Sequence, residues 1–256
     1  MTGCKRCRRV LRNFFMKTKK NTAISLQKVN KEYILHHEKP TFVENIIKRG
    51  YQEKFVAINN LNLEIAQGEK VGIIGANGAG KTTILKLIAG ITSPTSGKVS
   101  INGKVVSLID VAAGFHPDLT GEENIFLNGL LIGMSKDEIQ QKFDEIVSFA
   151  DIGKFIDSPL YTYSAGMNLR LGFSIAIHSD PDILLLDEGV VAGDENFSKK
   201  ISEKIKYFFN SGKTVILASH WLDYLHQNCN RIIWVDAGEI IRDGSINLLR
   251  EYKKDY

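Results

Sequence analysis

Apolar and polar positions alternate in two stretches near the start of the chain, Ile24–Val29 and Phe55–Glu64. Alternation with a period of two is typical of a strand that has one face on a core and the other in solvent. Continuous apolar runs follow at Val71–Ile74, Ile183–Leu186 and Thr214–Ala218. Because strands of a parallel sheet are buried on both faces, such runs indicate parallel strands. The pattern predicts an α/β fold with a mostly parallel sheet and an antiparallel part beside it.

Helical spacing dominates the middle of the chain, from Asn124 to Ile177. The clearest run is Lys136–Ala150, whose apolar residues fall on one helix face at Ile139, Phe143, Ile146, Val147 and Ala150. A second run covers Asn168–Ile177, and no strand-like stretch interrupts the two. This predicts an inserted α-helical subdomain over about residues 117–179. Shorter helices are expected at Ser198–Phe209 and Trp221–Gln227.

Turn residues suggest how the remaining strands connect. Gly97 and the pair Asn102-Gly103 bracket Lys98–Ile101, and Lys104–Ile109 comes next, which predicts an antiparallel hairpin beside the parallel core. Gly238 separates two further strand-like runs, which predict a final hairpin over residues 231–243. The last residues, 251–256, read as a charged terminus.

The first twenty residues carry eight basic side chains and no acidic one: Lys5, Arg6, Arg8, Arg9, Arg12, Lys17, Lys19 and Lys20. Without these charges the formal net charge falls from +4 to −4, so the rest of the chain gives no electrostatic argument for nucleic acid. We expect residues 1–23 to form a disordered tail; contact with anionic lipid and a true start at Met16 are the alternatives. No apolar run is long enough to predict a transmembrane helix. Three cysteines without a disulfide framework suit a reducing cytoplasm.

A glycine-rich stretch, Gly75–Thr83, fits the phosphate-binding pattern G-x-x-x-x-G-K-[ST]. It lies between a predicted strand and a predicted helix, so backbone N–H groups and the helix N-terminus can face phosphate oxygens. Lys81 can reach the outer phosphates, and the Thr82 hydroxyl can ligate Mg²⁺. The predicted contacts are Gly75, Ala76, Asn77, Gly78, Ala79, Gly80, Lys81, Thr82 and Thr83. The alternative is an ordinary glycine-rich turn.

Polar residues follow two of the buried strands directly. Asp187 and Glu188 come after Ile183–Leu186; Asp187 is placed to hold Mg²⁺ through water, and Glu188 to orient or deprotonate an attacking water. His220 follows Thr214–Ala218, where it could contact a γ-phosphate or that water, the alternative being a structural role. Strand ends of a parallel sheet share one edge, so these groups are expected near the phosphate loop.

One further stretch, Tyr163–Met167, precedes a predicted helix. Ser164 and Gly166 could meet an anion at that helix N-terminus, or simply cap it. With this stretch added, the chain resembles the nucleotide-binding subunits of ABC transporters from about Ile24 to Gly244. Gly75–Thr83 is similar to their Walker A motif, Tyr163–Met167 to their signature and residues 184–188 to Walker B. Residues 192–194, ending at Asp194, are similar to the D-loop, and His220 to the switch histidine.

The resemblance implies an ATPase that uses Mg²⁺, with residues 24–256 as one ABC ATPase domain. It also implies a head-to-tail dimer in which each ATP lies between Walker A of one subunit and Ser164, Ala165 and Gly166 of the other. Tyr33 is the candidate for stacking on adenine, with Tyr51 and Phe55 as runners-up. The Q-loop slot falls at Asp110 or Val111, and Asp110 is the candidate metal contact there.

A finer resemblance is to exporters of bacterial O-antigen, capsule and teichoic acid. It rests on the signature Tyr-Ser-Ala-Gly-Met, on residues 114–125, on the Walker B continuation 187–194, and on an insertion with a short helix over about 36–52. It implies a peripheral subunit at the cytoplasmic face of the inner membrane, present in two copies with a separate permease that is also expected in two copies. The alternatives are a soluble ABC ATPase without transport function and a phosphate-loop kinase.

Overall fold

The structure, a computed structural model, describes residues 21–35, 53–109, 111–187 and 195–255. The predicted tail, the insertion with its short helix, and the candidates Tyr51, Asp110, Glu188 and Asp194 lie outside these residues.

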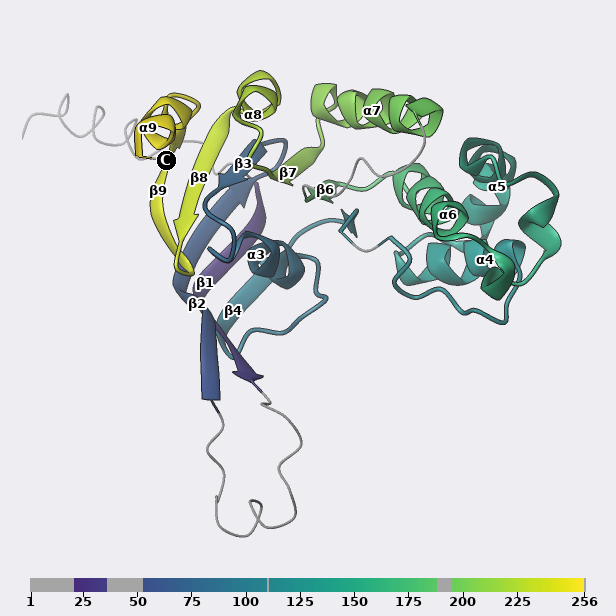
Figure 1. The fold of residues 1–256 in the computed structure, drawn as a ribbon, viewed down its shortest axis with the longest axis horizontal. Helices are drawn as coiled ribbons and strands as arrows, with labels where there is room; N and C mark the ends of the chain where they lie inside the picture. The colour runs from purple at the N-terminus through teal and green to yellow at the C-terminus, as the bar shows by residue number, and fades with distance from the viewer. Residues whose placement is uncertain (1–20, 36–52, 110, 188–194, 256) are drawn as a thin grey trace, which may run out of the picture.

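A six-stranded sheet forms the centre of the molecule (Figure 1). Its order is β5 (Val105–Ser107), β6 (Ile183–Leu186), β7 (Thr214–Ala218), β3 (Lys70–Ile74), β8 (Arg231–Asp236) and β9 (Glu239–Ser245). The first five strands are parallel, and β9 adds an antiparallel edge. Strands β3, β6 and β7 are buried along their whole length, as their continuous apolar runs predict.

A second sheet is antiparallel, with the order β2 (Glu53–Ala66), β1 (Thr22–Leu35) and β4 (Ser96–Ile101). The buried side chains Ile24 and Leu26 alternate with polar positions on β1 and pair with Ile65 and Leu63 of β2. The outer parts of β1 and β2 extend together away from the body of the molecule (Figure 1). The predicted combination of a parallel sheet with an antiparallel part is therefore present.

The hairpin predicted for Lys98–Ile101 and Lys104–Ile109 is wrong, because its two strands belong to different sheets. β4 pairs antiparallel with β1, and β5 pairs parallel with β6. The connecting turn packs on Asp182, whose Oδ2 accepts a hydrogen bond from Lys104 N at 2.9 Å. A Cβ on Gly103 would lie 2.9 Å from Asp182 Cβ. The turn thus directs the chain into a crossover beside β6 and not into a hairpin.

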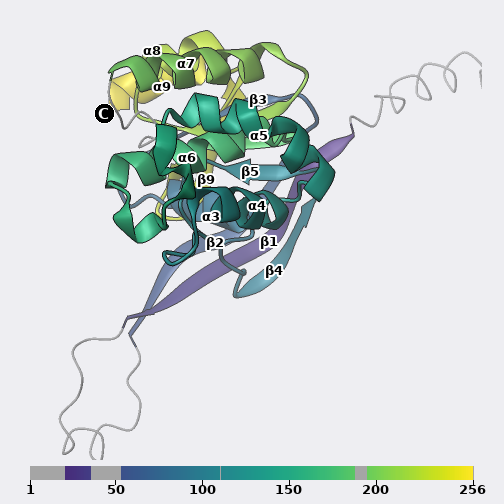
Figure 2. The same cartoon turned by 90° about the vertical axis from the view of Figure 1, so that its right-hand side faces the viewer.

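Three helices group together on one side of the molecule in both views, α4 (Gly121–Leu131), α5 (Lys136–Ala150) and α6 (Ala165–His178) (Figure 1, Figure 2). Two short 3-10 turns, Gly153–Asp157 and Leu160–Thr162, connect α5 to α6. These helices share a buried core that includes Ile125, Ile139, Ile146, Leu171 and Ile175. Capping boxes are present at the N-termini of α4 and α5, so local residues determine where both helices start.

The remaining helices cover the two faces of the central sheet. On one face α3 (Lys81–Ile88) shares a core with β1, β2 and β3. On the other face lie α7 (Glu195–Asn210), α8 (Leu222–Asn228) and α9 (Leu248–Asp255). No helix in the described ranges is long and apolar enough to cross a bilayer.

The C-terminal residues, predicted only as a charged terminus, belong to the helix α9. Leu248 and Leu249 of α9 are buried, and Tyr252 meets Trp234 edge-on with ring centroids 5.2 Å apart. Arg242 of β9 pairs with Glu251. One face of this short helix therefore packs on the sheet, while its charges remain outside.

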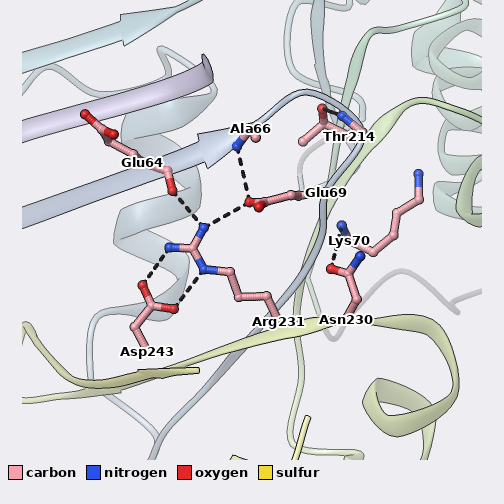
Figure 3. A network of polar contacts seen from close by, with 9 residues as sticks. Glu64, Ala66, Glu69, Lys70, Thr214, Asn230, Arg231 and Asp243 are labelled. Atoms are coloured by element: carbon pink, nitrogen blue, oxygen red, sulfur yellow. Dashed lines mark hydrogen bonds and ion pairs between the residues drawn. The ribbon is translucent and has the colours of Figure 1, made fainter. Parts of the chain in front are cut away.

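Arg231 connects the two sheets (Figure 3). Its Nε and Nη2 donate to both carboxylate oxygens of Asp243, at 2.8 and 2.6 Å. Its Nη1 donates to Glu64 O at 2.8 Å and to Glu69 Oε2 at 2.9 Å. The same Glu69 oxygen accepts from Ala66 N. The hydrogen bond with Asp243 raises the pKa of Arg231 above its ordinary value, so the guanidinium stays charged within this network.

Candidate functional site

The phosphate-binding stretch forms a loop between β3 and α3. Gly80 stands at the N-cap of α3 with φ 109°, a left-handed conformation that favours glycine. A Cβ on Gly75 would lie 2.1 Å from Val235 O, so no side chain fits there. The backbone of β8 thus holds the start of the loop, and the open N-terminus of α3 follows its end, the arrangement that binds anions.

An open pocket of about 250 Å³ lies over this loop. It is lined by Phe55, Ala57, Ala76, Asn77, Gly78, Ala79, Gly80, Lys81, Thr82, Thr83 and Asp187. Lys81 is buried, and its Nζ donates to Gly75 O at 2.7 Å and to Ala76 O at 3.1 Å. All of the predicted phosphate contacts except Gly75 therefore line one pocket, and Gly75 O accepts a hydrogen bond from Lys81.

The loop reaches the end of β6 through one hydrogen bond. Thr82 Oγ1 donates to Asp187 Oδ2 at 2.8 Å. A hydroxyl and a carboxylate are hard oxygen donors of the kind that Mg²⁺ prefers, and phosphates and waters usually complete its coordination. No group of three or more His, Cys, Asp or Glu side chains that could hold a metal ion occurs in the described part of the chain. The pair Thr82 and Asp187 thus fits a magnesium ion that is held jointly with a phosphate ligand.

His220 lies two residues beyond the end of β7, the strand that neighbours β3. Ser219 N donates to Ile73 O at 3.2 Å, which holds this segment beside the strand leading into the phosphate loop. His220 is exposed and meets the Trp221 ring edge-on, with centroids 6.2 Å apart. It is not among the described residues that line the pocket.

Two aromatic residues lie opposite each other near the pocket. Tyr33 of β1 and Phe55 of β2 are register partners and so share one face of the sheet. Phe55 lines the pocket, whereas Tyr33 does not. Lys31 Nζ lies 4.8 Å from the Tyr33 ring centroid and donates to Ser93 O at 3.0 Å. The geometry therefore favours Phe55, a runner-up to Tyr33 in the sequence-based prediction, as the aromatic at the nucleotide. Ala57 lines the pocket as well.

The predicted signature residues start α6. Ser164 Oγ accepts from Met167 N at 3.2 Å as the N-cap, and Ser164, Ala165 and Gly166 are exposed. None of these three lines the pocket, going by the described residues of this one chain. The exposed backbone at this helix start remains open to a ligand supplied from outside.

Tyr163 fixes the position of the signature. Its hydroxyl donates to Phe155 O at 2.6 Å, and a Cβ on Gly121 would lie 2.2 Å from that hydroxyl oxygen. Burial, with a smaller contribution from the Asp157 charge, raises the pKa of Tyr163 to about 12. The phenol therefore stays protonated and ties the signature to the neighbouring turn and to α4.

The segment after β5 is packed tightly against α6. A Cβ on Gly172 would lie 2.4 Å from Val111 O, so this backbone contact requires glycine. Farther along, the buried Asn124 amide donates to His116 O, Leu119 O and Thr120 O. Val111, the alternative to Asp110 for the Q-loop slot, thus lies between the central sheet and the helices α4, α5 and α6.

These features define a phosphate-loop nucleotide-binding protein with two sheets and a helical group set beside them. A family model described as ABC transporter matches residues 58–191, which span the phosphate loop, the signature and the end of β6. The chain belongs to the ABC transporter family, which confirms the resemblance predicted from the sequence.

Curated relatives include ATP-binding proteins of export systems. The chain is 44% identical over 232 residues to the O-antigen export system ATP-binding protein RfbB of Myxococcus xanthus, covering 87% of this chain and 53% of that protein. It is 38% identical over 238 residues to RfbB of Klebsiella pneumoniae, covering 90% and 97%. It is 38% identical over 237 residues to the teichoic acids export protein TagH of Bacillus anthracis, covering 92% and 43%. The chain thus spans about half the length of two of these relatives and nearly all of the third.

Solved structures support the same fold. A dimeric ATP-binding cassette in a post-hydrolysis state, bound to ADP and Pi, matches with a TM-score of 0.65 at 26% identity, covering 87% of this chain and 98% of that one. The ATP-binding subunit of another ABC transporter matches with a TM-score of 0.70 at 20% identity, covering 91% and 94%. The predicted fold class is confirmed by both.

Proposed function

We propose that this chain is the ATP-binding and ATP-hydrolysing subunit of an ABC exporter that moves a lipid-linked cell-surface polysaccharide. The observation that carries the nucleotide assignment is the Thr82–Asp187 hydrogen bond inside the glycine-lined pocket. A phosphate loop with a strand-end carboxylate is how this class of protein holds a nucleoside triphosphate. The names of the relatives, O-antigen and teichoic acid export proteins, support the polysaccharide as cargo.

The pocket would receive the phosphates of ATP. The Lys81 ammonium donates hydrogen bonds to the carbonyl oxygens of Gly75 and Ala76. When ATP binds, β- and γ-phosphate oxygens would replace these carbonyl oxygens as acceptors. Backbone N–H groups of the loop and the start of α3 would add further donors. Thr82 and Asp187 would hold Mg²⁺, which when bound neutralises charge on the phosphates. Phe55 would stack on the adenine, with Tyr33 beside it.

Residues around the γ-phosphate would support hydrolysis. Glu188 follows Asp187 directly, and we propose it as the base that orients or deprotonates the attacking water. His220 would contact the γ-phosphate or that water from the end of β7. Asp110 is retained as a further candidate metal contact.

We propose that a second copy of the chain completes the site. Its Ser164, Ala165 and Gly166 would face the γ-phosphate, with Asp194 at the same interface. Two observations support this: these residues are exposed at a capped helix start, and a similar cassette of known structure is a dimer. Shifting an open state to a closed one takes about 5.5 kcal/mol of differential binding, which γ-phosphate contacts from both copies could supply.

The exporter would also contain a membrane permease, with two copies the simplest match to two ATPase subunits. We propose that this chain binds it at the cytoplasmic face of the inner membrane as a peripheral subunit. The segment around Val111 is the proposed contact, because it packs directly on α6 and so connects a permease to the signature. Capsule, O-antigen and teichoic acid are the candidate cargoes.

The test has a biochemical and a cellular part. Phosphate release by the full chain should fall at least about a hundredfold in Lys81→Ala. Lys86→Ala, which removes a lysine from the same helix outside the pocket, should leave it unchanged. In cells, Lys81→Ala should abolish surface polysaccharide and accumulate its lipid-linked form inside. Normal surface polysaccharide in cells with an inactive ATPase would favour the alternative, a soluble ABC ATPase without transport function.

A further inference from the structure

An exposed indole, Trp221, lies three residues beyond the end of β7, the strand beside β3, which leads into the phosphate loop. The chain contains two tryptophans, and they differ sharply in environment. Trp234 is 7% exposed and packs on α9, whereas Trp221 is 63% exposed at the start of α8. Trp221 directly follows His220, which the proposed hydrolysis uses.

The position of Trp221 is set by the central sheet. Ser219 is held to Ile73 of β3, two residues before the phosphate loop, and Trp221 follows two residues later. The indole meets the His220 imidazole edge-on, with centroids 6.2 Å apart and planes at 86°. A group that covers this indole would therefore lie beside His220.

The backbone around Trp221 is held at both ends. Trp221 N donates to Ser219 Oγ at 3.0 Å. Trp221 O accepts from Tyr224 N and Leu225 N, both at 3.1 Å, which starts α8. A large aromatic side chain on a fixed backbone loses little conformational entropy when a partner covers it, so Trp221 can form an interface contact at low entropic cost.

We infer that Trp221 is a contact residue for a second copy of this chain in the ATP-bound dimer, and that this contact positions His220. The inference rests on the proposed function. Three observations support it: the exposed indole just beyond β7, next to the strand that leads into the phosphate loop; the exposed signature residues at the start of α6; and the dimeric state of a similar cassette. Tryptophan is enriched in interface cores, where charged residues are depleted, and it often dominates the binding energy.

The direct test measures how accessible Trp221 is to a quencher. The full chain with Glu188→Gln would be mixed with ATP and Mg²⁺, and acrylamide quenching of tryptophan emission compared with the nucleotide-free protein. The same measurement on Glu188→Gln with Trp221→Phe gives the Trp234 signal alone, and the difference isolates Trp221. Light scattering on each sample gives the oligomeric state. We expect ATP to form a dimer and to reduce quenching of Trp221 at least about threefold, with Trp234 unchanged.

The outcomes separate this inference from the proposed function. A dimer in which Trp221 stays as accessible as before overturns the inference and leaves the proposed dimer intact. Absence of a dimer despite bound ATP overturns both. Protection of Trp221 by ATP without a dimer likewise overturns both, and would show that ATP bound to the same chain covers the indole.

Affinity gives an independent measure of the same contact. In a two-fold dimer each contact occurs twice, so Trp221→Ala should raise the dimer dissociation constant about tenfold or more. Trp221→Phe should recover part of this loss. Because the contact positions His220, kcat per dimer should also fall in Trp221→Ala when the protein concentration is high enough to form the dimer fully. Tyr207→Ala is the matched control, because Tyr207 is another exposed aromatic, 60% exposed on α7. Equal effects of the Trp221 and Tyr207 changes would contradict a specific contact.

Discussion

Thr82 and Asp187 are 105 residues apart in the chain, yet Thr82 Oγ1 donates to Asp187 Oδ2 at 2.8 Å. The bond brings the start of α3 to the end of β6 and gathers two oxygen ligands at the pocket. Thr82→Ala removes one ligand and should raise the Mg²⁺ concentration needed for half-maximal ATPase activity about tenfold. Thr82→Ser keeps the hydroxyl and should remain near wild type. Measuring phosphate release against Mg²⁺ for both variants checks this; an unchanged Mg²⁺ dependence in Thr82→Ala would contradict the metal assignment.

Glu188→Gln should keep ATP binding while lowering ATP turnover at least about a hundredfold, because the amide cannot accept the proton of the attacking water. With ATP bound and not hydrolysed, the proposed dimer should persist. Size-exclusion chromatography with and without ATP measures this, together with phosphate release. Turnover near the wild-type rate would rule out Glu188 as the base.

Phe55→Ala should raise the KM for ATP several-fold with little change in kcat, because adenine stacking is made equally in the ground state and the transition state. Phe55→Tyr should stay close to wild type. Tyr33→Ala is the comparison, since Tyr33 is the register partner that does not line the pocket. A larger KM effect from Tyr33→Ala would restore Tyr33 as the stacking residue.

Arg231→Met should reduce the free energy of unfolding by about 2 kcal/mol, because it leaves Glu69 and Asp243 without their shared cation at the junction of the two sheets. Urea denaturation measures this. Lys54→Met, which breaks an exposed ion pair with Glu32, is the control and should cost at most about 0.5 kcal/mol. Similar losses in the two variants would mean that Arg231 contributes no more than a surface pair.

His178 should make the protein less stable in mild acid. Burial lowers the pKa of His178, and its Nδ1 lies 2.7 Å from Ser174 O, which requires a proton on Nδ1 of the neutral ring. The neighbouring charges of Lys204, Glu145 and Lys142 shift this pKa less than burial does. Below about pH 6.5 His178 binds a proton in the unfolded chain, whereas in the folded chain it stays neutral until the pH is lower.

The free energy of unfolding should therefore fall as pH drops from about 6.5 toward the lowered folded-state value, by at most about 1.4 kcal/mol per pH unit. It should not change on this account above about pH 7. Urea denaturation at several pH values measures the slope. His178→Gln should flatten it, whereas His226→Gln, at an exposed position on α8, should not. An unchanged slope in His178→Gln would show that other groups cause the acid sensitivity.

The sequence predicts an element best when neighbouring residues alone determine its type and bounds. The buried strands Ile183–Leu186 and Thr214–Ala218 and the helix Lys136–Ala150 have the predicted bounds. Continuous apolar runs or a capping box determine each of them. The phosphate loop belongs to the same group, since its glycines are required by its own backbone and by Val235 alongside.

Prediction fails where contacts with residues distant in the chain determine the structure. Residues 105–107 pair with β6 because the turn before them packs on Asp182, a contact some eighty residues away that alternation cannot show. Phe55 and Tyr33 have equivalent local signals and are register partners, and only the packing of the folded chain shows that Phe55 lines the pocket while Tyr33 does not. Helix α9 carries too few apolar residues for a periodic signal, and Trp234 and β9 supply its support.

The close contact of Gly172 with Val111 O has a mechanical consequence. Ser164 lies eight residues before Gly172, roughly 12 Å along the axis of α6. The far end of this helix is held as well, since Lys104 and Lys142 donate to Ser179 O and His178 O. Because α6 is held at its C-terminal end and touches Val111 near its middle, its movement is confined to the arm from Gly172 back to Ser164. A bend of about 10° at Gly172 would displace the signature serine by about 2 Å, the difference between making and losing a hydrogen bond.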